Sequence, residues 1–419
     1  MIQIFELSPG VTLRCFPDHR FKQSALSIQF VRPMCREEAA LNALLPAVLL
    51  RGSESCPDLR EITLKLDDLY GASVGALVRR VGDYQTTGLH ASFIEDRYAL
   101  QNDAILAPMV DFLRELLFSP VLEDGAFRTD FVESEKRNLI ATIESQKNDK
   151  RAYAGSQMIK KMCAADSFGI PRLGEKEQVA AITAQSLYDH YRKVLCESPV
   201  HLFYVGSAQP ERIAQLLKPL FLREGTPITL PPQAAYQDSG KGEYTEALDV
   251  AQGKLCMGFV TDITLRDPDF AAMQVFNALY GAGMTSKLFM HVREKLSLCY
   301  DIGSGYHSSK GIFTVSAGID FDQYDRVRQE VMTQLENCCR KDISSEELTA
   351  AKQALIAQLL STHDSPGAIE GYYATAALSG LAMDPAAYMQ AVETVTEGDV
   401  ARVANTLKLH TVYFLKGVK

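Results

Sequence analysis

Two side chains that can donate hydrogen bonds to a developing negative charge, Arg293 and Tyr300, lie close together in the second half of the chain. A guanidinium and a phenol are suitable donors for an oxygen that becomes anionic in a transition state. The pair also has a simpler interpretation, in which Arg293 is a solvated helix charge and Tyr300 is a core aromatic residue. The rest of the chain decides between the two interpretations.

The local pattern places both residues beside one turn. Two glycines, at positions 281 and 283, interrupt an apolar run, and apolar residues then recur at helical spacing, which predicts an amphipathic helix. After this helix the period changes to two. The pattern predicts a strand on which Leu298, Tyr300 and Ile302 share one face, ending at the glycines 303 and 305.

The eight histidines do not form a zinc motif of the kind carried by one helix. Two imidazoles must lie about one helical turn apart to reach one metal from one helix, and no two histidines have this spacing. The chain also has no G-x-S-x-G elbow, no P-loop and no G-x-G-x-x-G after a strand. The histidines are at positions 19, 90, 190, 201, 291, 307, 363 and 410.

Composition excludes other classes of function. The chain of 419 residues is 47% hydrophobic and 23% charged, and its net charge of -9 argues against binding to a nucleic-acid backbone. The N-terminal residues alternate like a strand rather than a signal peptide, and no apolar run approaches the roughly 18 residues that a spanning helix needs. Nine cysteines without a C-x-x-C pair indicate reduced thiols. We therefore expect a cytoplasmic protein that binds no nucleic acid and does not insert into a membrane.

A stretch rich in proline and glycine divides the chain. Residues 219–243 are typical of a linker between a first domain, residues 1–218, and a second domain, residues 244–419.

The two domains repeat one pattern. The segment 179–183, a helix and the segment 201–206 are echoed by 392–396, a helix and 412–417, which indicates an internal duplication. We expect an α+β fold of two tandem homologous α/β-sandwich halves, each a mostly antiparallel sheet with helices packed on one face. The expected strands are 11–16, 25–30, two between 72 and 93, 200–206, 255–260 and 312–319; the expected helices are 37–50, 58–70, 104–118, 126–147, 153–162, 186–194, 271–279, 324–338 and 345–362.

One segment resembles a known family. The run Thr285-Ser-Lys-Leu-Phe-Met-His-Val-Arg293-Glu-Lys-Leu-Ser-Leu-Cys-Tyr300 is similar to the second-half signature of the pitrilysin/insulinase-type inverzincin metallopeptidases, approximately S-R-L-F-x-x-V-R-E-x-x-G-L-A-Y. The resemblance extends over almost the whole chain, including Gly52-Ser53 after an apolar helix and Tyr204-Val-Gly206 near the end of the first half.

The catalytic half-site of that family is absent. Active members carry H-x-x-E-H, and this chain has Ala43 and Ala47 in place of the two zinc histidines and Pro46 in place of the general-base glutamate. The family's third ligand falls at Ile143 or Glu144, and a lone carboxylate cannot hold catalytic zinc. A proline inside a helix costs about 3 kcal/mol unless the helix kinks or begins there. The segment is therefore not expected to keep the parent geometry.

The resemblance implies a non-catalytic subunit without a metal cofactor of its own. In two-subunit members one subunit bears H-x-x-E-H, and the other contributes the arginine and tyrosine that correspond to Arg293 and Tyr300. We expect a heterodimer with a homologous zinc peptidase subunit, zinc in that partner and an unfolded peptide as substrate; whether the chain alone forms a homodimer stays open. The most similar subset is the bacterial cytoplasmic pairs, some of which are linked to elongation factor P modification or peptide maturation.

Two other functions stay open. The chain can be a non-proteolytic scaffold or peptide-binding subunit, like the family's respiratory-complex core subunits, in which case Arg293 and Tyr300 are structural. It can also be an independent metallopeptidase with rearranged ligands, which requires His90, His190 and His201 to converge on one metal.

Overall fold

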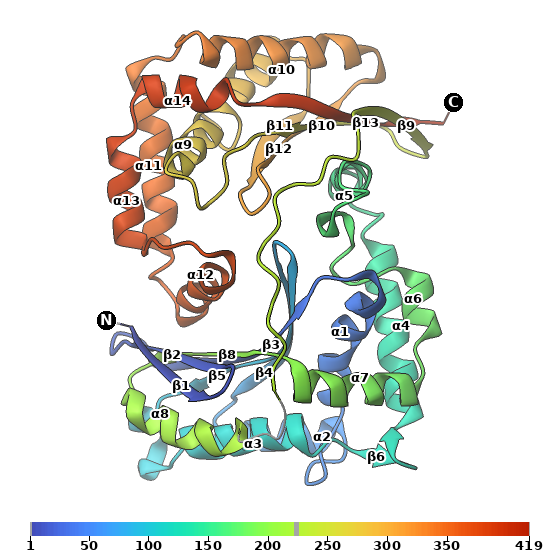
Figure 1. Ribbon diagram of the computed structural model, residues 1–419, viewed down its shortest axis with the longest axis vertical. Helices are drawn as coiled ribbons and strands as arrows, with labels where there is room; N and C mark the ends of the chain where they lie inside the picture. Colours follow the sequence, from blue (N-terminus) through green and yellow to red (C-terminus); the bar gives the residue numbers. More distant parts are fainter. Residues whose placement is uncertain (1, 222–225, 419) are drawn as a thin grey trace. The chain divides into compact units, whose positions relative to one another are not determined.

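The computed structural model describes residues 2–221 and 226–418 (Figure 1). Contacts group the chain into two compact units, and each unit takes one helical segment from the opposite half of the sequence. The sequential division into 1–218, 219–243 and 244–419 stays a prediction, and residues 222–225 of its linker lie outside the described residues. The first unit comprises Met1–Glu144, Ile170–Pro232 and His363–Leu378, and the second comprises Ser145–Gly169, Gln233–Thr362 and Ser379–Lys419.

A six-stranded sheet forms the centre of the first unit, in the order β1-β2-β8-β3-β5-β4. Strands β2 and β8 pair in parallel and the other neighbours pair antiparallel. Apolar residues of its helices pack on one face of this sheet in a single core cluster. The strands are β1 (Gln3–Ser8), β2 (Val11–Pro17), β3 (Gln23–Pro33), β4 (Ser73–Val81), β5 (Tyr84–Ile94) and β8 (Val200–Gly206), and the helices are α1 (Arg36–Leu49), α2 (Leu59–Asp68), α3 (Leu106–Phe118), α4 (Thr129–Ser145), α6 (Lys176–Ala181), α7 (Ala184–Glu197) and α8 (Pro210–Leu217).

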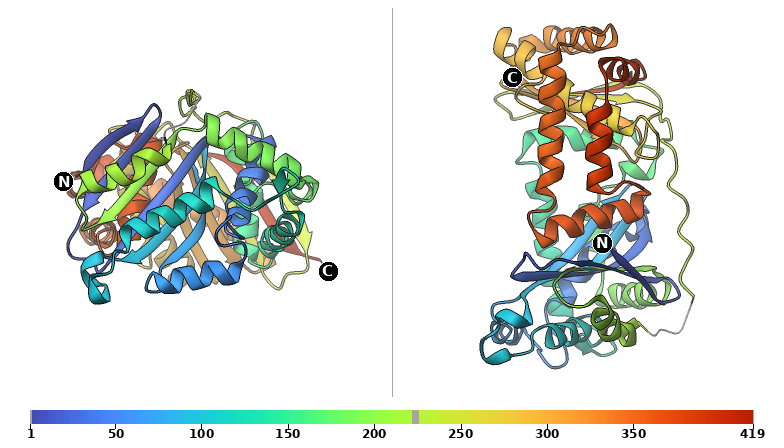
Figure 2. Two further views of the ribbon diagram at one scale, coloured as in Figure 1. Left: turned by 90° about the horizontal axis from the view of Figure 1, so that it is seen from below. Right: turned by 90° about the vertical axis from the view of Figure 1, so that its left-hand side faces the viewer.

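A five-stranded sheet forms the centre of the second unit, in the order β11-β12-β10-β13-β9. Figure 2 shows α11 and α13 of this unit running side by side. The strands are β9 (Gly242–Leu248), β10 (Gly253–Val260), β11 (Asp301–His307), β12 (Ile312–Ile319) and β13 (Lys408–Gly417), and the helices are α9 (Phe270–Tyr280), the π-helix η5 (Leu288–Lys295), α10 (Tyr324–Cys339), α11 (Ser345–Ser361), α13 (Pro385–Thr394) and α14 (Glu397–Ala404). The remaining short elements are η1 (Asp96–Tyr98), η2 (Leu100–Asn102), β6 (Leu122–Glu123), β7 (Ala126–Phe127), η3 (Ser167–Gly169), η4 (Lys218–Phe221) and η6 (Phe321–Gln323).

The two sheets repeat one topology. The order β2-β8-β3-β5-β4 corresponds to β9-β13-β10-β12-β11. In the first sheet β8 pairs in parallel with β2 and antiparallel with β3, and in the second sheet β13 pairs in parallel with β9 and antiparallel with β10. The expected α+β fold of two homologous halves is therefore confirmed.

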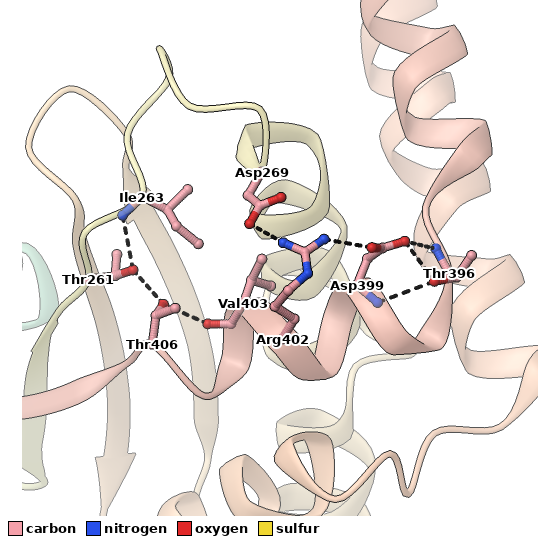
Figure 3. Close-up of polar contacts among 8 residues, drawn as sticks. All are labelled: Thr261, Ile263, Asp269, Thr396, Asp399, Arg402, Val403 and Thr406. Atoms are coloured by element: carbon pink, nitrogen blue, oxygen red, sulfur yellow. Dashed lines mark hydrogen bonds and ion pairs between the residues drawn. The ribbon is translucent and has the colours of Figure 1, made fainter.

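The helix that precedes the last strand begins in the same way in both halves. The side chain of Thr183 accepts a hydrogen bond from the main-chain N–H of Ser186 at the start of α7. Thr396 caps α14 through the N–H of Asp399, and Arg402 joins Asp399 to Asp269 of the α9 cap (Figure 3). These capping boxes, in which the side chains of the first and fourth residues bond to each other's main-chain N–H, satisfy N–H groups that a helix start leaves unpaired.

One helix from each half covers the second face of the other half's sheet. Helix α5 (Lys150–Met162) packs Met158 and Met162 on β10 and β13 of the second unit. Helix α12 (Pro366–Ser379) packs Ile369 against Phe203 of β8 in the first unit. Each half therefore carries helices on one face of its sheet and a single exchanged helix on the other. Helix α12 was not predicted from the sequence.

A buried carboxylate fixes α12 on the first sheet. Glu370 accepts hydrogen bonds from Ser27 Oγ at 2.7 Å and Gln29 Nε2 at 2.8 Å. The guanidinium of Arg79 on β4 donates to both carboxylate oxygens, at 2.8 and 2.7 Å. Because a buried charge is costly unless it is paired, this network fixes the position of the helix.

None of the helices in residues 2–221 and 226–418 is both long and apolar enough to cross a membrane.

Candidate functional site

Helix α1 carries the three positions that correspond to H-x-x-E-H. Ala43 and Pro46 are buried and Ala47 is half-buried. Methyl groups and a pyrrolidine ring offer no lone pair to a metal and no group that can accept a proton. These three positions therefore have no capacity for zinc chemistry.

Helix α1 runs through Pro46, so the helix does not begin at this residue. Proline has no N–H, so the carbonyl of Asn42, four residues earlier, loses its helical partner. Thr87 of β5 replaces that partner by donating its hydroxyl to the Asn42 carbonyl at 2.8 Å. A side chain of the sheet thus compensates for the proline.

Buried polar side chains hold α1 against the sheet and α7. Oδ1 of Asn42 lies 2.8 Å from Nε2 of His190, and Asn42 Nδ2 donates to Gln85 at 2.9 Å. Burial lowers the pKa of His190 to about 4, so the imidazole is neutral near pH 7 and donates through Nε2–H. This histidine has a structural role in the fold.

The two candidates for the third-ligand position, Ile143 and Glu144, have different surroundings on the long helix α4. Ile143 is half-buried and packs against the core cluster to which α1 contributes. Glu144 is half-exposed and forms an ion pair with Lys176 of α6. Ile143 is therefore the more buried of the two and the carboxylate of Glu144 pairs with an ammonium group, while the residue that corresponds to the third ligand stays a prediction.

The structure contradicts the convergence of His90, His190 and His201 on one metal. His190 lies on α7, which packs on the core face of the first sheet. His201 pairs with Gln29 in the sheet and faces the opposite side, where its ring approaches Phe203. Within the described ranges, 2–221 and 226–418, no three histidine, cysteine or acidic side chains are arranged to hold a metal ion.

In the second unit, η5 presents Arg293. Its side chain is 42% exposed, stacks on the ring of Phe289 at 4.6 Å and has Glu294 at 3.6 Å from Nε. The helix itself is anchored by Lys287, a buried residue that donates to Glu347 of α11 at 2.9 Å. The anchored helix therefore carries a guanidinium that stays accessible to an external group.

Tyr300 follows η5 across a turn and is 52% exposed, so the interpretation as a core aromatic residue is wrong. Its hydroxyl donates to Oδ1 of Asp320 at 2.9 Å, and this hydrogen bond to a carboxylate raises the pKa of Tyr300. Arg293 and Tyr300 thus lie on one connected segment but do not contact each other directly.

The predicted strand around Tyr300 differs from the observed one. Residues 298–300 lie outside any strand and Tyr300 forms a bend, so the period of two does not extend through them: Leu298 and Ile302 are buried, whereas Tyr300 is exposed. Strand β11 runs from Asp301 to His307 and includes both glycines at which the prediction ended it. A Cβ at Gly303 would lie 3.2 Å from the guanidinium of Arg151, so this glycine gives a side chain room rather than ending the strand.

Comparisons with known proteins agree with this architecture. A family model described as "Peptidase M16 inactive domain" matches residues 181–355. The relative named "Probable inactive metalloprotease YmfF" of Bacillus subtilis (strain 168) is 30% identical over 411 residues, covering 98% of this chain and 96% of the relative.

Two solved structures have the same fold. A conserved protein from Enterococcus faecalis V583 is 30% identical, with a TM-score of 0.93 and coverage of 100% of this chain and 99% of that chain. The peptidase M16 inactive domain from Pseudomonas fluorescens is 17% identical, with a TM-score of 0.82 and coverage of 100% and 98%.

The fold and the site define a duplicated α+β protein of the metallopeptidase type in which the zinc-binding helix has lost its ligands. The chain belongs to the M16, or pitrilysin/insulinase-type, peptidase family, among its members without H-x-x-E-H. By itself it lacks the residues with which that family hydrolyses peptides.

Proposed function

We propose that this chain pairs with a homologous subunit that bears H-x-x-E-H, and that it contributes Arg293 and Tyr300 to peptide processing in the cytoplasm. One observation carries the proposal. The first-half positions that correspond to the zinc site hold two alanines and a proline, whereas Arg293 and Tyr300 are retained with side chains 42% and 52% exposed.

The chemistry of the two side chains suits this role. A guanidinium carries several N–H donors in one plane, and the Arg293 side chain is 42% exposed, so it can bind an anionic carbonyl oxygen. Tyr300 can donate one hydrogen bond to the same oxygen once its hydroxyl leaves Asp320. Zinc fits none of the three α1 positions, so the metal and the nucleophile belong to the partner in this proposal.

A scaffold or peptide-binding role without hydrolysis is the second candidate. The contacts of Arg293 with Phe289 and of Tyr300 with Asp320 favour it, because both side chains have a local partner within the second unit. In that case the two residues stabilise the surface and donate to no substrate.

Peptidase kinetics distinguish the two functions. The chain is assayed on a fluorogenic peptide alone, and mixed with a homologous zinc subunit that bears H-x-x-E-H. The variants Arg293→Ala and Tyr300→Phe are tested beside Lys295→Ala, which removes a charge from an exposed position on the same helix.

The proposal predicts activity in the mixture above that of the partner alone. Each site variant is expected to lower kcat by tenfold or more, which corresponds to about 1.4 kcal/mol of transition-state stabilisation. The Lys295→Ala control should match the wild type. A mixture no more active than the partner, or site variants equal to wild type, would establish the scaffold role instead.

The oligomeric state gives a second test of pairing. Light scattering of the chain alone, of the partner alone and of the mixture should show a species with the mass of a one-to-one heterodimer only in the mixture. Homodimers that persist unchanged after the partner is added would contradict the pairing.

A further inference from the structure

Two hydrogen bonds tie Tyr300 to the end of strand β12. The main-chain N–H of Tyr300 donates to the carbonyl of Gly318 at 2.8 Å, and its hydroxyl donates to Asp320 Oδ1 at 2.9 Å. Both acceptors lie at the junction between β12 and η6. The backbone and the tip of the tyrosine are therefore held by the same short segment.

A phenol has one proton to donate. While that proton lies between Tyr300 and Asp320, it cannot stabilise an anionic oxygen elsewhere. The ring is 52% exposed, so packing does not prevent its rotation away from Asp320. In the isolated chain the phenol hydroxyl is thus already hydrogen-bonded to Asp320, and it must break this bond before it can donate to a substrate.

The charges around Tyr300 single out Asp320. Asp301, the next residue along the chain, is balanced by Arg151 at 3.2 Å and Lys254 at 3.6 Å. Arg293 of η5 stacks on Phe289, and Cys299 is half-buried beside the same turn. Asp322 on η6 is exposed, and the pKa of the phenol is raised by Asp320 alone among the charged groups. Asp320 is therefore the charged group that acts directly on the hydroxyl.

We propose that Asp320 is a positioning residue for Tyr300, which holds the phenol hydroxyl in the unpaired chain and releases it when Tyr300 turns to a substrate. The inference rests on the proposed function for its consequence in catalysis. The contact itself is a property of the isolated chain.

The first experiment uses the isolated chain. The titration of Tyr300 is followed through its Cζ carbon resonance in a tyrosine-labelled sample, assigned by its loss in Tyr300→Phe. Asp320→Asn should lower the pKa of Tyr300 toward the ordinary value of about 10, whereas Asp322→Asn, which removes the same charge two residues further along the chain, should not. An unchanged pKa in Asp320→Asn, and in Asp320→Ala as a second variant, overturns the proposal.

The second experiment uses the mixture with the H-x-x-E-H subunit and the fluorogenic peptide. If Asp320 competes for the hydroxyl, its replacement should raise kcat by about three- to tenfold with little change in KM, and should have no effect when Tyr300 is already phenylalanine. A kcat that falls or stays constant in Asp320→Asn, while Tyr300→Phe lowers it, overturns the proposal. If Tyr300→Phe equals wild type, the proposed function fails, and the titration alone decides whether Asp320 holds the phenol.

Discussion

The hydroxyl of Thr87 donates to the main-chain carbonyl of Asn42 at 2.8 Å, and this carbonyl is the one that Pro46 leaves without a helical partner. Thr87 is 1% exposed and Asn42 is fully buried, so water cannot serve as the donor. A buried carbonyl without a partner costs free energy comparable to a lost hydrogen bond. Strand β5 thus allows a helix with an internal proline to continue to Leu49.

Replacement of Thr87 by valine is expected to destabilise the first unit. Valine has nearly the same shape but leaves the Asn42 carbonyl without a donor, so the free energy of unfolding should fall by about 1–3 kcal/mol. Urea unfolding followed by circular dichroism measures the change.

The matched control restores the helical donor. Pro46→Ala returns an N–H to position 46, so Thr87→Val should cost much less in the Pro46→Ala background than in the wild type. Equal costs in both backgrounds would show that the Thr87 hydroxyl does not act through the Asn42 carbonyl.

Local signals in the sequence were sufficient for most elements. The expected helix 58–70 and the expected strand 200–206 correspond to α2 and β8 within two residues. The way in which α1 accommodates Pro46 could not be predicted, because the compensating donor, Thr87, comes from a strand distant in sequence, and a helix pattern contains no information about such a partner.

In the second half, the face of Tyr300 was predicted wrongly and helix α12 was not predicted. Tyr300 lies in a bend before β11 and not in a strand, so counting residues with a period of two could not place it on a face. Helix α12 contains glycines 367 and 371, which weaken its helix signal, and it gains its stability from Glu370 contacts to β3 and β4. Tertiary contacts decided both cases.

His190 is expected to make the first unit sensitive to acid. Burial lowers its folded-state pKa to about 4, whereas in the unfolded chain it titrates near 6.5. Between these values the unfolded state binds more protons, so stability is highest above the unfolded pKa and falls as pH falls. From about pH 7 to about pH 5 the loss attributable to His190 is about 2 kcal/mol.

The variant His190→Gln isolates this contribution. Glutamine can still donate to Asn42 Oδ1 but does not titrate, so its unfolding free energy should depend less on pH than that of the wild type. His19→Gln at an exposed position is the control and should keep the wild-type slope. A slope in His190→Gln equal to the wild type would assign the acid sensitivity to other groups, of which His201, with its pKa also lowered to about 4 by burial, is the first to test.

The contact between Arg79 and Glu370 is expected to control how firmly α12 binds the first sheet. Arg79→Met keeps much of the apolar stem but leaves a carboxylate that is 4% exposed with Ser27 and Gln29 as its remaining donors. Because Arg79 is partly exposed, the expected loss is about 1–3 kcal/mol, below the usual cost of breaking a fully buried pair. Hydrogen exchange should show faster exchange in α12, measured peptide by peptide.

The pair of Arg128 and Asp130 is the comparison for this change. Its geometry is also bidentate, but the Asp130 side chain is 61% exposed whereas that of Glu370 is 5% exposed, so Arg128→Met should leave exchange in α12 at the wild-type rate. Arg79→Met without faster exchange in α12 would mean that apolar packing alone holds the helix.

Zinc binding tests which residue of α4 faces the degenerate site. The wild-type chain is expected to bind no stoichiometric zinc, because Ala43 and Ala47 offer no ligand, and a chelator should leave its unfolding midpoint unchanged.

In a variant with Ala43→His and Ala47→His, adding Ile143→Glu should strengthen zinc affinity by about tenfold or more, since Ile143 packs toward the core to which α1 contributes. Adding Glu144→Gln instead should leave the affinity unchanged, because that carboxylate pairs with Lys176 at the surface. Isothermal titration with zinc measures all four proteins, and a loss of affinity in the Glu144→Gln version would place the ligand position at Glu144 rather than Ile143.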